Sequence, residues 1–196
     1  MVAIRNWAWL FPLTLVAAHA YPASGPPPAE HARLYASESG RTGFKVIPLG
    51  PKVGVREHLG VLFAVEPDGT DRLLWRSPLV AQPYAAYLHD LHDHRRVVAL
   101  RYTLFPPTTP SEHVLVVYGD QGQPIADYRL DQLLPAEEIR KHVNVTDVFG
   151  KGWLRNATCR FVTSGPPNAL RYLFRVKQPW GREVTVDVTS GKLVPE

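Results

Sequence analysis

The chain has 196 residues, of which 45% are hydrophobic, 10% aromatic and 20% charged, and its formal net charge at pH 7 is +4. This apolar fraction excludes a fully disordered chain, and a single cysteine excludes a disulfide-bonded scaffold. The 19 prolines argue against long helices, because a proline in a helix interior costs about 3 kcal/mol.

Residues 1–20 have the pattern of a secretory signal peptide. Arg5 provides a positive charge, an apolar stretch follows, and Ala18 and Ala20 are the small residues that a signal peptidase recognises. The apolar stretch contains Pro12 and is shorter than the roughly 20 residues of a membrane-spanning helix, so a retained anchor is the weaker alternative. We therefore expect export to the periplasm or the extracellular space, with no membrane span after cleavage.

Residues 21–42 have the composition of a flexible leader. Pro22, Pro26, Pro27 and Pro28 lie among Ala, Ser and Gly, which favours extended and solvated backbone over packing. We expect the remainder, residues 43–196, to form a single β-rich domain that is long enough to bury a core without disulfides.

The first strand signals flank a tight turn. Between Gly60 and Glu66 the residues are all apolar (Val-Leu-Phe-Ala-Val), Asp68 and Gly69 follow, and Arg72 leads into a second apolar stretch, Leu-Leu-Trp. An Asp-Gly pair between two such runs is a strong hairpin signal. Residues 96–104 then alternate between apolar and other side chains, as a strand with one buried face does.

Further strands are separated by turn residues in the second half of the chain. Residues 113–118 are apolar on both faces, as a central strand would be, and the turn 120–122 leads into a strand over 124–130. Ser190 and Gly191 mark a last turn. The predicted fold class is mainly β, an antiparallel meander or sandwich, or blade-like sheets, with one or two short connector helices.

The last long hairpin has a register that its face pattern predicts. Apolar side chains alternate along residues 170–177 and again along 183–189. They share one face of the sheet if a five-residue loop pairs Lys177 with Glu183, whereas a four-residue loop would pair Lys177 with Arg182 and mix the faces. We therefore predict the longer loop, or a bulge around residues 179–181.

Helix is expected mainly over residues 135–142. Pro135 suits a first helical position, Glu137 and Glu138 complement the amino end, and three basic residues complement the carboxyl end. Residues 145–149 are a candidate for one further turn. Both would be connectors between sheets.

Residues 113–134 contain an apolar strand, a Tyr-Gly-Asp-Gln-Gly turn, a second strand and a Leu-Asp-Gln-Leu-Leu end. This segment resembles a β-propeller blade hairpin, in which a strand ends in a Tyr-Asp-x-x-Gly-type turn and the next strand leads into a short helical link. It is also similar to segments of uncharacterised exported bacterial proteins. A closed propeller needs at least four blades of roughly 40–50 residues, so we expect blade-like sheets and no closed ring.

The densest polar cluster is residues 89–94, His-Asp-Leu-His-Asp-His. Imidazole and carboxylate groups bind zinc and copper, so one hypothesis is a metal-dependent enzyme or metal-binding protein that uses His89, His92 and His94. The other two are pH sensing by clustered histidines and a solvated hairpin tip. The cluster resembles the motif of metallo-β-lactamase-like hydrolases, but Leu91 stands where that motif needs a histidine, and we assign no metal ligand.

No catalytic constellation is evident from the sequence. A Gly-x-Ser-x-Gly elbow is absent, and the side chains of the neighbours Ser111, Glu112 and His113 alternate in direction. There is no Gly-rich phosphate loop and no dinucleotide fingerprint. We assign no catalytic residue and no cofactor.

Cys159 is the one cysteine of the chain, and it alternates with neighbours of different character. Cys159 and Phe161 share one face of the expected strand, whereas Arg160 and Val162 share the other. We interpret Cys159 as a small buried hydrophobe. An exposed thiol that takes part in redox chemistry or forms a dimer is the alternative.

Positive charge is concentrated near the carboxyl end. Residues 150–196 carry eight Lys or Arg and three Asp or Glu, whereas residues 21–149 carry 13 Lys or Arg and 15 Asp or Glu. The candidate partner-binding residues are Arg160, Arg171, Arg175 and Lys177. They would meet an anionic polymer, such as lipopolysaccharide or a teichoic acid, or an acidic protein. Nucleic acid is a poorer fit because that face lacks interleaved aromatic residues, and the alternative is a solvated face paired with Glu183 and Asp187.

Asn144 and Asn156 each begin an Asn-x-Thr glycosylation pattern. Arginine outnumbers lysine by 16 to 6, which is associated with GC-rich bacterial genomes, and in such a source both patterns are silent. The leading hypothesis is a periplasmic or secreted, non-catalytic β-sheet protein that binds a protein or an anionic envelope component.

Overall fold

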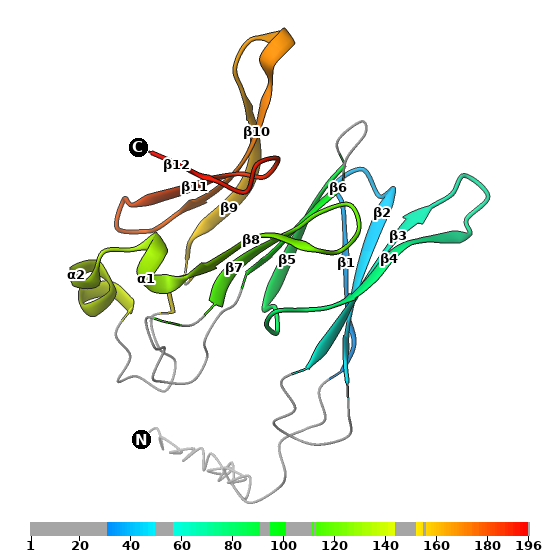
Figure 1. Cartoon of the computed structure of the whole chain (residues 1–196), viewed down its shortest axis with the longest axis horizontal. Helices are drawn as coiled ribbons and strands as arrows, with labels where there is room; N and C mark the ends of the chain where they lie inside the picture. Colours follow the sequence, from blue (N-terminus) through cyan, green and yellow to red (C-terminus); the bar gives the residue numbers. More distant parts are fainter. Residues whose placement is uncertain are drawn as a thin grey trace, which may run out of the picture.

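The chain forms three four-stranded antiparallel sheets that follow one another along the sequence (Figure 1). The computed structural model describes residues 31–49, 57–90, 95–100, 111, 113–143, 152–154 and 156–195. The prediction of a mainly β fold made of antiparallel meanders with short helices is confirmed. The predicted signal peptide at 1–20 and the candidate turn at 145–149 lie outside the described residues.

The first sheet has its strands in the order β1-β2-β3-β4. These strands are β1 (Arg33–Ala36), β2 (Thr42–Pro48), β3 (His58–Val65) and β4 (Asp71–Pro78). The predicted hairpin is confirmed: Gly69 has a φ of 83°, and the Asp68 carboxylate accepts a hydrogen bond of 2.9 Å from the Thr70 N–H. Glycine is favoured there because a positive φ is strained for residues with a Cβ atom.

Ordered structure begins earlier than the sequence suggested. Residues 21–42 were expected to be a flexible leader, yet β1 pairs with β2 along its whole length, Arg33 with Val46 through Ala36 with Gly43. The proline run ends at Pro28, so every residue of β1 has an N–H group that can bond to the free edge of β2. Composition alone did not reveal this pairing, because its partner lies beyond the turn.

The middle sheet has its strands in the order β5-β6-β7-β8. These strands are β5 (Ala85–Asp90), β6 (Arg95–Leu100), β7 (His113–Tyr118) and β8 (Pro124–Arg129). The prediction that β7 is apolar on both faces is confirmed, because every residue from Val114 to Tyr118 is buried. The predicted strand 96–104 is present up to Leu100, and residues 101–104 lie outside the described part of the chain. The expectation of one buried face is wrong, because every residue from Arg96 to Leu100 is buried and both faces of β6 are covered.

The last sheet has its strands in the order β12-β11-β10-β9. These strands are β9 (Thr158–Ser164), β10 (Arg171–Lys177), β11 (Glu183–Asp187) and β12 (Leu193–Val194). Lys177 pairs with Glu183 and Arg175 with Thr185, so the register predicted from the longer loop is confirmed. A short 3-10 turn, η2 (Pro167–Ala169), connects β9 to β10.

Within the described ranges, the α- and π-helical residues form short connectors after β8. These are α1 (Leu130–Leu133), α2 (Ala136–Glu138) and the π-helical turn η1 (Ile139–Val143). The predicted helix over 135–142 corresponds to α2 and η1. The segment 113–134 forms β7, β8 and α1, which is the strand, turn, strand and helical link expected of a blade-like hairpin.

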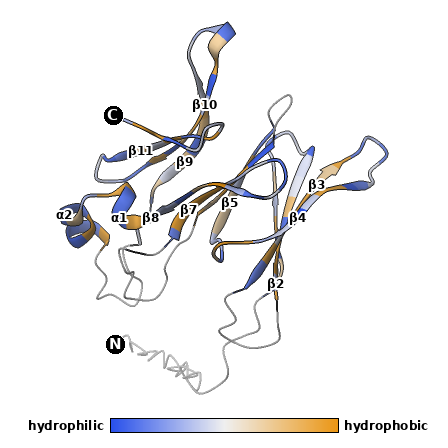
Figure 2. Ribbon diagram, in the orientation of Figure 1, coloured by the Kyte–Doolittle hydropathy of each residue, from blue (hydrophilic) through white to orange (hydrophobic). Residues whose placement is uncertain are grey.

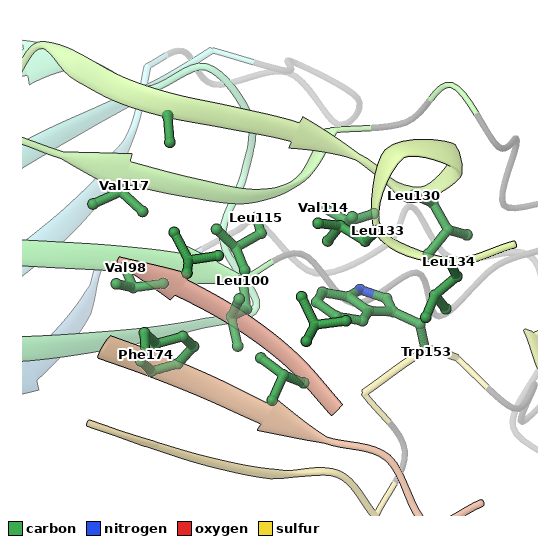
Figure 3. Packing of buried hydrophobic residues seen from close by; sticks show 14 of the residues in the cluster. Val98, Leu100, Val114, Leu115, Val117, Leu130, Leu133, Leu134, Trp153 and Phe174 are labelled. Carbon is green, nitrogen blue, oxygen red and sulfur yellow. The ribbon is translucent and has the colours of Figure 1, made fainter. Parts of the chain in front are cut away.

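Two apolar cores lie on opposite sides of the middle sheet. The core shared with the last sheet contains Val98, Leu100, Leu115, Val117, Phe174, Val176, Val184, Val186, Val188 and Trp153, and Figure 3 shows part of it. The core shared with the first sheet contains Phe44, Val46, Leu62, Trp75, Leu79, Val97, Ala99, Val116 and Tyr118. Alternate residues of β6 and β7 therefore enter alternate cores, and the middle sheet is covered on both faces. The hydrophilic colouring of α2 in Figure 2 contrasts with these packed strands.

We expect Leu115→Ala to lower the free energy of unfolding by about 2–5 kcal/mol, because it opens a cavity under a side chain with 0% exposure. Leu73→Ala is the matched control, since Leu73 is 60% exposed and its truncation should change stability by less than about 0.5 kcal/mol. Urea unfolding followed by tryptophan fluorescence measures both. Equal losses in the two variants would contradict the burial of the middle sheet.

Candidate functional site

The four candidate partner-binding residues lie together on β9 and β10 of the last sheet. In the register of these strands Arg160 is directly opposite Arg175, and Arg171 and Lys177 lie on the same face of β10 as Arg175. The residues between them pack into the core and so face the other way: Tyr172, Phe174 and Val176. We call Arg160, Arg171, Arg175 and Lys177 the basic face.

Two of the four basic residues are paired with carboxylates of β11. Arg171 Nε lies 3.4 Å from Asp187 Oδ2, and Arg175 Nε lies 3.5 Å from Glu183 Oε1. The alternative interpretation, a solvated face cross-paired to these two acids, is therefore confirmed for half of the set. Such exposed pairs contribute little to stability, about 0–1 kcal/mol each.

Arg160 differs from the other arginines of the basic face. It is exposed, and it forms no ion pair with any residue that the structure describes. The residue directly opposite on β10 is Arg175, and like charges at opposed positions of a sheet destabilise it. Arg160 therefore brings a positive charge that β11 does not neutralise.

Leu173 lies on the same side of β10 as the arginines but is only 4% exposed. Arg171 and Arg175 flank it along the strand, and Val162 is opposite it on β9. The aliphatic stems of arginine can cover such a residue while their charged ends stay in water. The charged groups of the basic face thus surround an apolar floor, where electrostatic interactions are stronger than in open water.

A pocket of about 270 Å³ is lined by residues from all three sheets. The lining residues are Ser37, Glu38 and Ser39 from the turn after β1, Leu88, His89 and Asp90 from β5, and Phe161 from β9. The sequence singled out His89 and Asp90 but missed the serines and Glu38, because they fall in the stretch interpreted as a leader. A Ser-Glu-Ser-Gly turn was the signal that could have found them.

Asp90 is held by hydroxyl groups of the first sheet. Ser39 Oγ donates to Asp90 Oδ2, Thr42 Oγ1 donates to Asp90 Oδ1, and Ser37 Oγ lies 3.0 Å from Ser39 Oγ. Burial by itself would raise the pKa of Asp90, but the hydroxyls of Ser39, Thr42 and Ser37 and the charge of Arg95 outweigh it and lower this pKa. Asp90 is therefore an ionised carboxylate at neutral pH.

His89 points to the other side of β5, toward the last sheet. Its ring lies 4.6 Å from the Phe161 ring at an interplanar angle of 13°, and 5.9 Å from the Tyr172 ring. Burial lowers the pKa of His89, although Asp90 and Glu38 oppose that effect. The imidazole is therefore uncharged at neutral pH.

The metal hypothesis depends on residues that the structure covers only in part. Among the described residues, no group of three or more His, Cys, Asp or Glu is placed to hold a metal ion. His89 and Asp90 point to different sheets, so these two neighbours do not converge on one point. His92 and His94 lie outside the described residues, and the metal and pH-sensing hypotheses stay predictions.

Cys159 is partly buried, not fully buried as predicted, and it packs against the core between the middle and last sheets. Burial raises the pKa of its thiol, against a hydrogen bond with the Tyr87 hydroxyl that lowers it. Burial, and then Cys159 itself, raises the pKa of Tyr87 to about 12. A raised pKa leaves little thiolate, which favours the interpretation of Cys159 as a small buried hydrophobe over a reactive thiol.

No protein-family model, no curated protein and no solved structure matches the chain. Of the resemblance noted for residues 113–134, the structure supports the architecture: the chain forms three blade-like four-stranded antiparallel sheets. None of the helices in the described ranges is long and apolar enough to cross a membrane.

We expect Asp90→Asn to lower the free energy of unfolding at pH 7 by about 1–3 kcal/mol, because the hydroxyl hydrogen bonds lose a charged acceptor. Since the folded-state pKa of Asp90 is lowered, its stabilising effect is present above the unfolded pKa and is lost as pH falls through the folded value. The difference in free energy of unfolding between the wild type and the variant should therefore become smaller at acid pH. Urea unfolding at neutral and acid pH measures it, with Asp71→Asn, an exposed aspartate of β4, as the control. A difference that grows in acid would contradict the assignment.

Proposed function

We propose that the protein is an exported, non-catalytic β-sheet module whose basic face binds a phosphate-bearing polymer of the cell envelope. The observation that carries the proposal is the directly opposed pair Arg160 and Arg175. A phosphate group between two guanidinium groups would receive charge-assisted hydrogen bonds from both.

The geometry of the basic face favours a polymer over a compact ligand. Successive same-face positions along a strand are about 7 Å apart, so Arg175 and Lys177 are about 7 Å apart and Arg171, beyond Leu173, is about 13 Å from Arg175. The three residues present a row of charges along β10. A chain with repeating anionic groups can meet several of them at once. A single small anion can meet one or two, and each such contact is weak when exposed to water.

The charge balance and the signal-like leader support the same proposal. The excess of basic residues is confined to residues 150–196, so the molecule has a charged side and not a uniform charge. The pattern of residues 1–20 supports delivery to the compartment where envelope polymers are found. An acidic protein is the competing partner, and the binding experiment separates the two.

We expect Arg160→Glu to weaken binding to the polymer by about tenfold, which corresponds to about 1.4 kcal/mol. The same change should raise the free energy of unfolding by about 0.2–1 kcal/mol, because it replaces a like-charge pair by an opposite-charge pair with Arg175. The measurements are sedimentation with lipopolysaccharide, pull-down with lipoteichoic acid, and urea unfolding. Opposite changes in binding and stability separate a binding residue from a structural one.

The matched control is Arg76→Glu, which reverses an exposed arginine on β4 of the first sheet and should leave binding unchanged. Wild-type binding should fall as salt rises from about 0.05 M to about 0.5 M, because the screening length shortens. Capture that persists at high salt, or an equal effect of the two reversals, would refute the role of the basic face. Binding to neither polymer would leave an acidic protein as the partner and overturn the proposal.

A further inference from the structure

The pocket beside Asp90 differs chemically from the basic face, and none of the four basic-face residues lines it. One side consists of the hydroxyl and carboxylate groups of the turn after β1 and the end of β5. The other side consists of Phe161 and Leu88. A volume of about 270 Å³ is close to the lower end of the range for small-molecule sites, about 300–1,000 Å³.

The hydroxyl protons around this pocket already take part in hydrogen bonds within the protein. Ser39 and Thr42 donate theirs to Asp90, so in the 3.0 Å contact between Ser37 and Ser39 the donor is Ser37. Two backbone N–H groups add further donors to the serines, Thr42 N to Ser37 Oγ and Arg41 N to Ser39 Oγ, each at 3.2 Å. Ser39 Oγ thus accepts two hydrogen bonds and has no lone pair left, whereas Ser37 Oγ keeps one. The hydroxyls offer a ligand no free proton, so the ligand itself has to donate.

The charge of the pocket is negative. Asp90 is partly balanced by Arg95, whose Nε lies 4.0 Å from Asp90 Oδ1. Glu38 is exposed and forms no ion pair with any residue in the described part of the chain. The imidazole of His89 is uncharged at neutral pH and so does not offset Glu38.

Two other ligand classes fit the described lining less well. For a divalent metal ion, the described residues form no group of three ligating side chains. A sugar needs hydrogen-bond donors as well as acceptors from its site, and here the hydroxyl donors are committed. What remains is a ligand that brings positive charge and several N–H groups.

We propose that this pocket binds a primary ammonium group carried on a short aliphatic chain. The ammonium group has three N–H donors, which match the three acceptors that the lining offers: the carboxylates of Glu38 and Asp90 and the free lone pair of Ser37 Oγ. Its aliphatic chain packs on Leu88 and Phe161, the apolar part of the lining. Two sources share this chemistry, a free diamine and a lysine side chain of a peptide.

The test is titration of the full chain with 1,5-diaminopentane by calorimetry or NMR. We expect binding of the diamine and none of 1,5-pentanediol, which has the same chain but no charge. Glu38→Gln should lower the affinity for the diamine by about fivefold to tenfold, equivalent to about 1–1.4 kcal/mol. Phe161→Leu should also lower this affinity. Because Glu38 is exposed, its conversion to Gln leaves the fold intact, which circular dichroism checks.

Glu137→Gln on α2 is the matched control, an exposed glutamate outside the pocket, and it should bind the diamine as wild type does. A lysine-containing tripeptide with blocked ends distinguishes the two sources: diamine binding alone supports a small-molecule ligand, and binding of both supports a peptide lysine. Binding of neither, equal binding of diol and diamine, or an unchanged affinity in Glu38→Gln would overturn the proposal. Since Arg160 is not varied, failure here leaves the proposal for the basic face unaffected.

Discussion

The arrangement of the three sheets depends on a middle sheet that is apolar on both faces. Side chains of successive strand residues point to opposite faces, so Val97 and Val98 enter different cores, as do Val116 and Val117. A sheet of this kind is stable only when both faces are covered. One sheet on each side provides that cover, and Tyr118 on one side and Phe174 on the other illustrate how large side chains fill the two interfaces.

The same constraint explains where the polar surfaces lie. The first and last sheets each pack one face on the middle sheet, so each leaves its other face outside both described cores. In the last sheet this outer face carries the arginines, with Leu173 buried among them. The alternation is visible in two neighbours of β9: Phe161 packs toward the core and the pocket, whereas Arg160 belongs to the basic face.

Alternation also divides the histidine-rich segment. His89 and Asp90 are adjacent in the sequence and look like a pair of ligands. In the sheet His89 stacks on Phe161 of the last sheet, while Asp90 accepts hydrogen bonds from Ser39 and Thr42 of the first. Strand geometry thus makes each residue a contact between β5 and a different neighbouring sheet, and it places an acceptor-rich pocket where the three sheets meet.

Much of the local structure could be predicted because it depends on short-range patterns. The turn at Gly69 needs a residue that tolerates a positive φ, and the pairing of Lys177 with Glu183 follows from keeping apolar side chains on one face. The burial of β7 on both faces followed from its unbroken apolar run. The pocket and β1 could not be predicted, since their partners are distant in the sequence: Ser39 meets Asp90 only after the first and middle sheets have packed.

By itself, the sequence determined the strands, the turns and the concentration of basic residues near the carboxyl end, because hydrophobic periodicity, turn chemistry and charge are local properties. Tertiary structure decided which charges are neutralised and which groups share a site. Arg171 and Arg175 acquire carboxylate partners from β11, whereas the register brings Arg160 opposite another arginine. Long-range pairing controls these outcomes, since the interaction of two side chains depends on their separation in space and on the water excluded around them.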